Sequence, residues 1–187
     1  MTTRDLSLAA LFAALIAVLG MMPPVPLGFI PVPITLQSMG AMLAGTILGA
    51  KRGGLAVLLF ILLVAVGLPV LSGGRGGLAV LLGPTGGYIF GWIAAAVVCG
   101  LLSERLVREG QSEWRQMGGF FLAAVLGGIV VLYAIGAPWV TASTGTPLGT
   151  VLAGSLAFIP GDLLKAAVAT VAARAVLAGY PLLPQRA

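Results

Sequence analysis

Histidine is absent from this chain of 187 residues, and cysteine occurs once, as Cys99. Without histidine the chain cannot build a proton relay through imidazole, a zinc site with histidine ligands or a serine–histidine triad. A single cysteine cannot form a disulfide framework within the chain. Charged residues are also scarce, at 8% of the chain against about 25% in an average soluble domain. The remainder is 59% hydrophobic, which predicts an integral membrane protein.

Six apolar stretches have the length of a membrane-spanning helix. They cover residues 6–22, 34–50, 55–68, 86–102, 118–137 and 148–178. The last stretch is too long for one untilted span, and Pro160 and Gly161 in its middle predict a kink or a restart. We therefore expect an all-α integral membrane protein with six transmembrane helices, which together form one domain, residues 1–187.

The loops on the two sides of the predicted bundle differ in charge. Most basic residues fall on the side that carries both termini: Arg4, Lys51, Arg52, Arg105, Arg108, Arg115, Arg174 and Arg186. The loops of the other side contain Arg75 alone. The positive-inside rule then places both termini in the cytoplasm. This asymmetry accounts for the net charge of +5 without a nucleic-acid partner.

Three segments on the side of Arg75 are irregular in composition. Residues 23–33 contain five prolines, residues 69–85 are rich in glycine, and residues 138–147 are rich in threonine and serine. Irregular backbone near a membrane is tolerated where it is buried in protein or lines a cavity. We expect these loops to cap a pocket that faces outward.

Asp162 and Lys165 lie inside the last apolar stretch, three positions apart on one helix face. One interpretation is a structural ion pair that locks the helix. The other is a ligand site, in which the carboxylate accepts and the ammonium group donates hydrogen bonds. The second is favoured, because ionisable residues inside a membrane are costly and commonly mark functional sites.

Four further residues near the predicted pocket have two interpretations each. Arg75 is either a solvated loop charge or a contact for an anionic ligand. Thr35 and Gln37 follow the proline-rich loop and bind either a ligand or a neighbouring helix. Tyr88 is either an interfacial anchor or an aromatic wall with a hydroxyl group. The sequence leaves these alternatives open.

Small residues recur every four positions in the first apolar stretch, as Ala9, Ala13 and Ala17 and as Ala10 and Ala14. Such spacing lets another helix approach closely. Packing inside the bundle and docking onto a partner subunit both fit this pattern.

Nothing in the chain predicts a cofactor, a metal site or a catalytic site. The glycine-rich residues 83–87 lack the Gly-Lys-Ser/Thr of a P-loop, so the chain cannot hydrolyse ATP by that route. Residues 74–79 fit a loose dinucleotide fingerprint, but the acidic residue expected about 20 positions later is missing. A membrane enzyme is disfavoured by the absent histidine, and a pore by the lack of a ring of charges.

Four short runs, taken together in this order and spacing, resemble the BioY family. They are residues 32–37 (VPITLQ), 67–70 (GLPV), 83–88 (GPTGGY) with Gly91 and Trp92, and 161–165 (GDLLK). BioY proteins are the biotin-specific substrate-binding components, or S components, of energy-coupling-factor (ECF) transporters. The similarity extends over most of the chain.

The resemblance implies a biotin pocket near the outer face, capped by the loops after the first, third and fifth helices. It implies that Asp162 and Lys165 hydrogen-bond the ligand, with Tyr88 and the glycine-rich loop nearby, including Gly83 and Thr85. A transported vitamin would then be the ligand, and the subunit would perform no covalent chemistry. An S component for thiamine or riboflavin and a biotin transporter that acts alone remain as alternatives.

The resemblance also implies partners in a bacterial cytoplasmic membrane. These are a transmembrane coupling subunit and two ATP-binding-cassette ATPases, with the small-residue face of the first helix as the docking surface. The sequence leaves open whether copies of the chain associate into a homo-oligomer.

Overall fold

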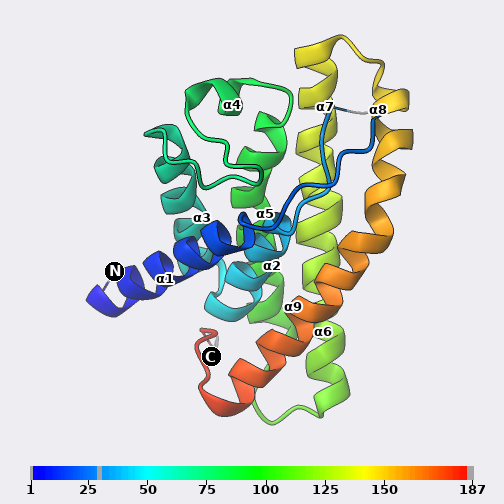
Figure 1. Cartoon of the computed structure of the whole chain (residues 1–187). Coiled ribbons are helices and arrows are strands. Elements are labelled where there is room, and N and C mark those ends of the chain that lie inside the picture. Colours follow the sequence, from blue (N-terminus) through cyan, green and yellow to red (C-terminus); the bar gives the residue numbers. More distant parts are fainter. Residues whose placement is uncertain (1, 29–30, 185–187) are drawn as a thin grey trace.

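The structure is a computed structural model that describes residues 2–28 and 31–184. Arg186 and two residues of the proline-rich loop, Phe29 and Ile30, therefore lie outside the described part. The helices are α1 (Thr3–Leu19), α2 (Gln37–Leu48), α3 (Ala50–Ala65), α4 (Leu78–Leu82), α5 (Gly86–Leu106), α6 (Glu113–Val125), the π-helix η1 (Leu126–Val131), α7 (Leu132–Thr144), α8 (Leu148–Ser155), the 3-10 helix η2 (Leu156–Phe158) and α9 (Ile159–Gly179). Two rods are continuous, one formed by α6, η1 and α7 and the other by α8, η2 and α9 (Figure 1).

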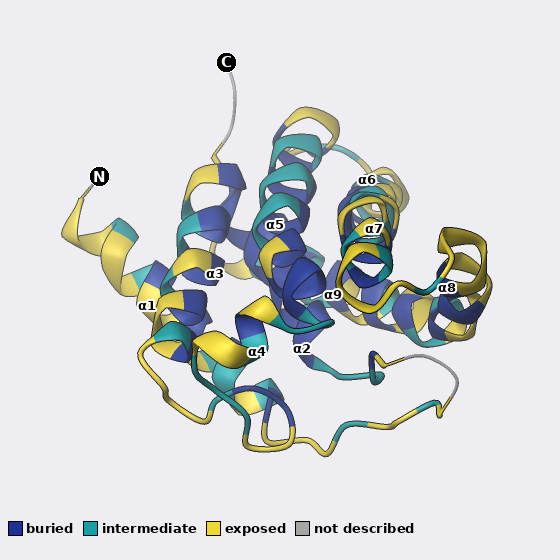
Figure 2. Ribbon diagram, turned by 90° about the horizontal axis from the view of Figure 1, so that it is seen from above, coloured by how far each residue is buried: buried dark blue, intermediate teal, exposed yellow. Residues whose placement is uncertain are grey.

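Helix α2 occupies the centre of the bundle (Figure 2). All of its twelve residues except Met39 are buried. It packs against α1, α3, α5, α9 and η1. The approach to α5 is close enough to require glycine, because a Cβ at Gly45 would lie 2.3 Å from the carbonyl oxygen of Ala96. Burial on every side fits the small and apolar residues that make up most of this helix.

Three helical rods among the described residues are long and apolar enough to cross a membrane: Gly86–Leu106, Glu113–Thr144 and Leu148–Gly179. Large apolar side chains are exposed along α1, α3, α8 and α9, as expected of a protein surrounded by lipid. Helices α1, α2 and α3 contain 17, 12 and 16 residues, fewer than the roughly 20 residues of a typical span. The chain is thus an all-helical membrane protein, and the number of spans stays a prediction.

Two predicted helix starts are wrong. Ile34 is not helical, because it exchanges two backbone hydrogen bonds of 2.9 Å with Val25, and α2 begins three residues later. Lys51 and Arg52 belong to the first turn of α3 instead of a loop. Gly49 alone connects α2 to α3, with a φ of 82° that favours glycine.

The loop that the sequence predicts from Pro138 begins later than expected. Helix α7 continues through Pro138 to Thr144, so the connection to α8 is only residues 145–147. A proline removes one helical hydrogen bond, which membrane helices tolerate when neighbouring groups compensate. Here Ala137 and Val140 are fully buried, and this packing holds the helix together across the proline.

The predicted interruption of the last stretch is confirmed. Helix η2 separates α8 from α9, and α9 begins at Ile159 with Pro160 in its first turn. Pro160 has no backbone N–H and cannot donate the helical hydrogen bond of its position, which fits the change of helix type just before it. The restart places Asp162 in the first turn of α9, where the positive end of the helix dipole favours a carboxylate.

The two ends of the bundle differ in their charged residues. At the end near the termini, Arg52 pairs with Asp5 at an Nε–Oδ1 distance of 2.6 Å, and Arg174 pairs with Glu113. The opposite end carries the loop between α3 and α4, the turn between α7 and α8, and α4, a short helix that the sequence did not predict (Figure 1). We call this opposite end the α4 end. Arg75 belongs to the loop between α3 and α4.

A glycine-to-alanine substitution on α5 tests the close packing of this helix on α3. A Cβ at Gly100 would lie 2.2 Å from the backbone nitrogen of Ala50, which cannot move aside. We expect Gly100→Ala to destabilise the protein by about 1–3 kcal/mol and to lower its unfolding temperature in detergent. Gly118→Ala on α6 is the matched control, because nothing lies within 4 Å of its Cβ position. Equal unfolding temperatures for the two variants would contradict this packing.

Candidate ligand-binding site

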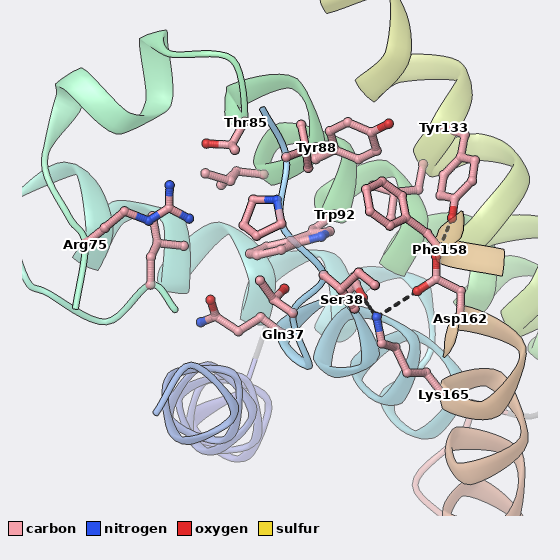
Figure 3. Close-up of a pocket in the computed structure, with 17 residues that line it drawn as sticks. Gln37, Ser38, Arg75, Thr85, Tyr88, Trp92, Tyr133, Phe158, Asp162 and Lys165 are labelled. Carbon is pink, nitrogen blue, oxygen red and sulfur yellow. Dashed lines mark hydrogen bonds and ion pairs between the residues drawn. The ribbon is translucent and has the colours of Figure 1, made fainter. Parts of the chain in front are cut away.

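A cavity lies at the α4 end, between the connecting loops and helices α2, α5, α7 and α9 (Figure 3). Two loops contribute to its wall: the α1–α2 loop (described as residues 20–28 and 31–36) and the α3–α4 loop (residues 66–77). The lining residues are Val32, Pro33, Ile34, Thr35, Gln37, Ser38, Leu71, Arg75, Thr85, Tyr88, Ile89, Trp92, Leu132, Tyr133, Phe158, Asp162 and Lys165. A mostly apolar wall with a few placed polar groups is typical of a small-molecule site.

A cluster of four polar side chains occupies one side of this cavity. The Nζ of Lys165 donates to Asp162 Oδ1 at 2.7 Å and to Ser38 Oγ at 3.0 Å. The Oη of Tyr133 donates to Asp162 Oδ2 at 2.5 Å. Asp162 and Lys165 are only 5% and 7% exposed. The two charged residues that the sequence singled out therefore face each other and the cavity (Figure 3).

The cluster has hydrogen-bonding capacity left for a ligand. An ammonium group has three donors, and Lys165 uses two of them on Asp162 and Ser38. Since Ser38 Oγ accepts from Lys165, its own hydrogen can be donated. Each carboxylate oxygen of Asp162 accepts one hydrogen bond here and has room for another. The cluster can thus donate to a carbonyl group and accept from an adjacent N–H group.

Aromatic rings form much of the remaining wall. The ring of Tyr133 meets those of Tyr88 and Phe158 edge to face, at centroid distances of 6.2 and 6.3 Å. Tyr88 is 7% exposed, and its hydroxyl lies 3.3 Å from Ser155 Oγ. This burial favours the interpretation of Tyr88 as a cavity wall over that of an interfacial anchor. Trp92 lines the same wall one helical turn further along α5.

The opposite side of the cavity carries Arg75 (Figure 3). Its Nε donates to the carbonyl oxygen of Ser72 at 3.1 Å, and the side chain is half-buried and lines the cavity. Thr35 and Thr85 line the cavity as well. Gly83 is not among the lining residues, and its carbonyl oxygen accepts a hydrogen bond from the indole of Trp139 at 2.9 Å. Its contact with a ligand stays a prediction.

Gln37 borders the cavity, but its amide group is engaged by the protein. The Nε2 donates to the carbonyl oxygens of Ile16 and Val70, at 3.1 and 2.9 Å. The Oε1 accepts from the backbone nitrogen of Ser72 at 2.8 Å. Of the two interpretations that the sequence allowed, contact with neighbouring elements is the one that the described bonds favour.

The alanines of α1 divide between two faces. Ala9 and Ala13 are buried against the rest of the bundle. Ala10 and Ala14 are exposed, and Ala17 is intermediate. One row of alanines is therefore packed inside the bundle, and the other is exposed, where a second helix could approach closely.

Sequence reasoning missed Tyr133 and Phe158 as candidate residues, and it named Trp92 only as part of a family motif. Tyr133 lies in the apolar run 118–137, where no local pattern shows which face reaches the cavity. Its neighbour η1 is a π-helix, a type of turn that is frequent at functional sites. That turn is a tertiary feature with no sequence signal of its own.

Comparisons with known proteins identify the family of the chain. The sequence profile of the BioY family matches residues 1–182. The biotin transporter BioY of Rhizobium etli is 60% identical over 187 residues, and the match covers 100% of both chains. The biotin transporter BioY of Rhodobacter capsulatus is 48% identical over 182 residues, covering 92% of this chain and 93% of the relative.

A solved structure has the same fold. It is the S-component for biotin from an ECF-type ABC transporter, which is 37% identical in sequence. The superposition has a TM-score of 0.88 and covers 97% of each chain. Because a family profile matches nearly the whole sequence and relatives match at high identity, the chain belongs to the BioY family.

Proposed function

We propose that this protein binds biotin and takes part in its uptake as the substrate-specific subunit of an ECF-type transporter. The observation that carries the proposal is the buried cluster of Asp162, Lys165, Tyr133 and Ser38, which keeps free donors and acceptors beside an aromatic cavity. The relatives named as biotin transporters and the solved biotin S-component support it. The protein acts by binding, without covalent chemistry or a cofactor of its own.

Biotin matches the distribution of polar groups around the cavity. Its ureido group offers one carbonyl oxygen and two N–H donors, and its valerate chain ends in a carboxylate. We assign the ureido carbonyl to the free donors of Lys165 and Ser38 and a ureido N–H to Asp162. The carboxylate then faces Arg75 across the cavity, and the apolar ring system lies against the aromatic wall. Exclusion of water strengthens each of these hydrogen bonds.

We further propose six membrane spans with both termini in the cytoplasm of a bacterium. The basic residues near the termini favour this orientation by the positive-inside rule. The α4 end and its cavity then face outward. Helices α1, α2 and α3 are short for spans, which requires the bundle to thin the bilayer locally or to bury them within it.

The proposed partners are a transmembrane coupling subunit and two ATP-binding-cassette ATPases. The sequence contains no P-loop, so any ATP hydrolysis that drives release would take place on another subunit. Ala10 and Ala14 on the exposed face of α1 offer a surface on which a partner helix can pack closely.

Substitutions of the charged pair test the biotin site. We expect Asp162→Asn and Lys165→Ala each to raise the Kd for biotin at least about tenfold, equivalent to roughly 1.4 kcal/mol. The reason is that each change weakens or removes a ligand contact and leaves the buried charge of the former partner without its counter-charge. Equilibrium binding to the purified protein in detergent measures the effect. Thr170→Val, which removes a buried hydroxyl on the same helix away from the cavity, is the control. Unchanged affinity in folded variants would refute the assignment.

The assignment of Arg75 makes a separate prediction with biotin methyl ester, which lacks the negative charge. We expect Arg75→Ala to weaken the binding of biotin about five- to tenfold, because a charge-assisted hydrogen bond is lost. The same variant should bind the methyl ester as well as the unmodified protein does. Titrations of both ligands against both proteins measure this. An equal loss for the two ligands would show that Arg75 does not contact the carboxylate.

Bulky residues on α1 test the docking surface. We expect Ala10→Trp and Ala14→Trp to lower the yield of the complex with the coupling subunit at least about fivefold, since a large side chain holds two helices apart. Biotin binding by the isolated protein should stay intact. Val171→Trp, at an exposed position of α9, is the control. Co-purification of tagged complexes is the measurement, and full yield from both α1 variants would rule out this surface.

A further inference from the structure

The amide group of Gln37 joins three separate parts of the chain. Gln37 is the first residue of α2. Its amide group bonds the carbonyl oxygen of Ile16 in the last turn of α1. It also bonds the carbonyl oxygen of Val70 and the backbone nitrogen of Ser72, both in the α3–α4 loop. Both of its N–H donors are used, and the residue is 1% exposed. Because both N–H groups are engaged by the protein, Gln37 has no donor left for a ligand, although it borders the cavity.

Gly20 provides the space that this amide occupies. A Cβ at Gly20 would lie 2.4 Å from Nε2 of Gln37 and 2.4 Å from the carbonyl oxygen of Val70. The backbone of Gly20 has a φ of −71°, which any residue adopts without strain. The absence of a side chain here therefore serves the Gln37 contacts and not the backbone conformation.

The bonds of Gln37 continue to Arg75 through Ser72. The backbone nitrogen of Ser72 donates to Gln37, and its carbonyl oxygen accepts from Arg75 Nε. Leu71 and Arg75 also exchange two backbone hydrogen bonds, of 3.0 and 3.2 Å, which close a tight turn around Ser72. The hydroxyl of Ser72 donates to the carbonyl oxygen of Met22 at 2.7 Å, which ties the start of the α1–α2 loop to the same point.

We propose that Gln37 is a positioning residue that fixes Arg75 for the carboxylate end of the ligand by fastening the α3–α4 loop to the end of α1. The inference rests on the proposed function, in which Arg75 faces that carboxylate. A glycine-rich loop has many backbone conformations available, and holding the turn at Ser72 in place restricts the positions that Arg75 can reach. The position of α1 is thereby linked to the anion-facing side of the cavity.

The decisive variant is Gly20→Ala, because Gly20 does not line the cavity and its loss cannot remove a ligand contact. We expect it to raise the dissociation rate of biotin at least about fivefold, as one or two buried hydrogen bonds are broken. Gln37→Leu should act in the same direction. Thr46→Val is the matched control: it removes a fully buried hydroxyl from the same helix, α2, without touching either loop. Its rate should stay within about twofold of the unmodified protein.

Measurements on the Arg75→Ala protein distinguish a positioning role of Gln37 from a general loss of stability. If Gly20→Ala acts through Arg75, it should change the dissociation rate less than about twofold when combined with Arg75→Ala, because coupled residues are not additive. Gly20→Ala should also raise the dissociation rate of biotin more than that of biotin methyl ester. A general defect would act equally on both ligands and in both backgrounds, and that result would overturn the inference.

Hydrogen exchange of the ligand-free protein gives a readout that does not depend on biotin. We expect Gly20→Ala and Gln37→Leu to speed exchange in the α3–α4 loop, including the amide of Ser72, while α5 and α9 are unaffected. Unchanged exchange in this loop would overturn the fastening role. Failure of the unmodified protein to bind biotin would instead refute the proposed function and with it the role of Arg75, while exchange would still decide whether Gln37 fastens the loop.

Discussion

A lysine ammonium and an aspartate carboxylate, both more than nine-tenths buried, impose the constraint on which the rest of this bundle depends. Neither group can remain charged in hydrocarbon without a partner, because desolvation of a lone ion is too costly. Lys165 and Asp162 bond each other from one helix, Ser38 joins from α2, and Tyr133 joins from α7. Three helices are thus held in register by the groups that we assign to the ligand, so packing and recognition use the same contacts.

The cavity separates its polar groups into two sides with an apolar region between them. The buried cluster lies on one side, Arg75 lies on the other, and Trp92 and Phe158 belong to the wall between (Figure 3). The two sides differ in how they are built. The cluster sits on regular helices, whereas Arg75 sits on a loop whose position depends on the amide of Gln37. In the proposed binding mode, regular helices hold one end of the ligand, and a loop fastened by Gln37 holds the other.

The sequence predicted features that depend on local composition and spacing. The helical class, the restart near Pro160 and the contact of Asp162 with Lys165 all follow from such patterns, and the structure contains them. Tyr133 was not predicted, because its hydroxyl bonds a residue 29 positions away, on a helix that the sequence does not show to be a neighbour. The passage of α7 through Pro138 was also missed, since burial of neighbouring residues outweighs a local propensity. Tertiary contacts decided each feature that local reasoning failed to find.

The direct bond between Lys165 and Asp162 also has an electrical consequence. Their opposite charges compensate each other in the empty cavity, so neither group needs a counter-ion from solution after the ligand leaves. A membrane potential does work of about 2.3 kcal/mol per 100 mV on each elementary charge that crosses it, but almost none on two opposite charges that move together. If the ligand-free protein changes conformation and moves these two groups together, the membrane potential therefore adds almost nothing to the energy of that change through them.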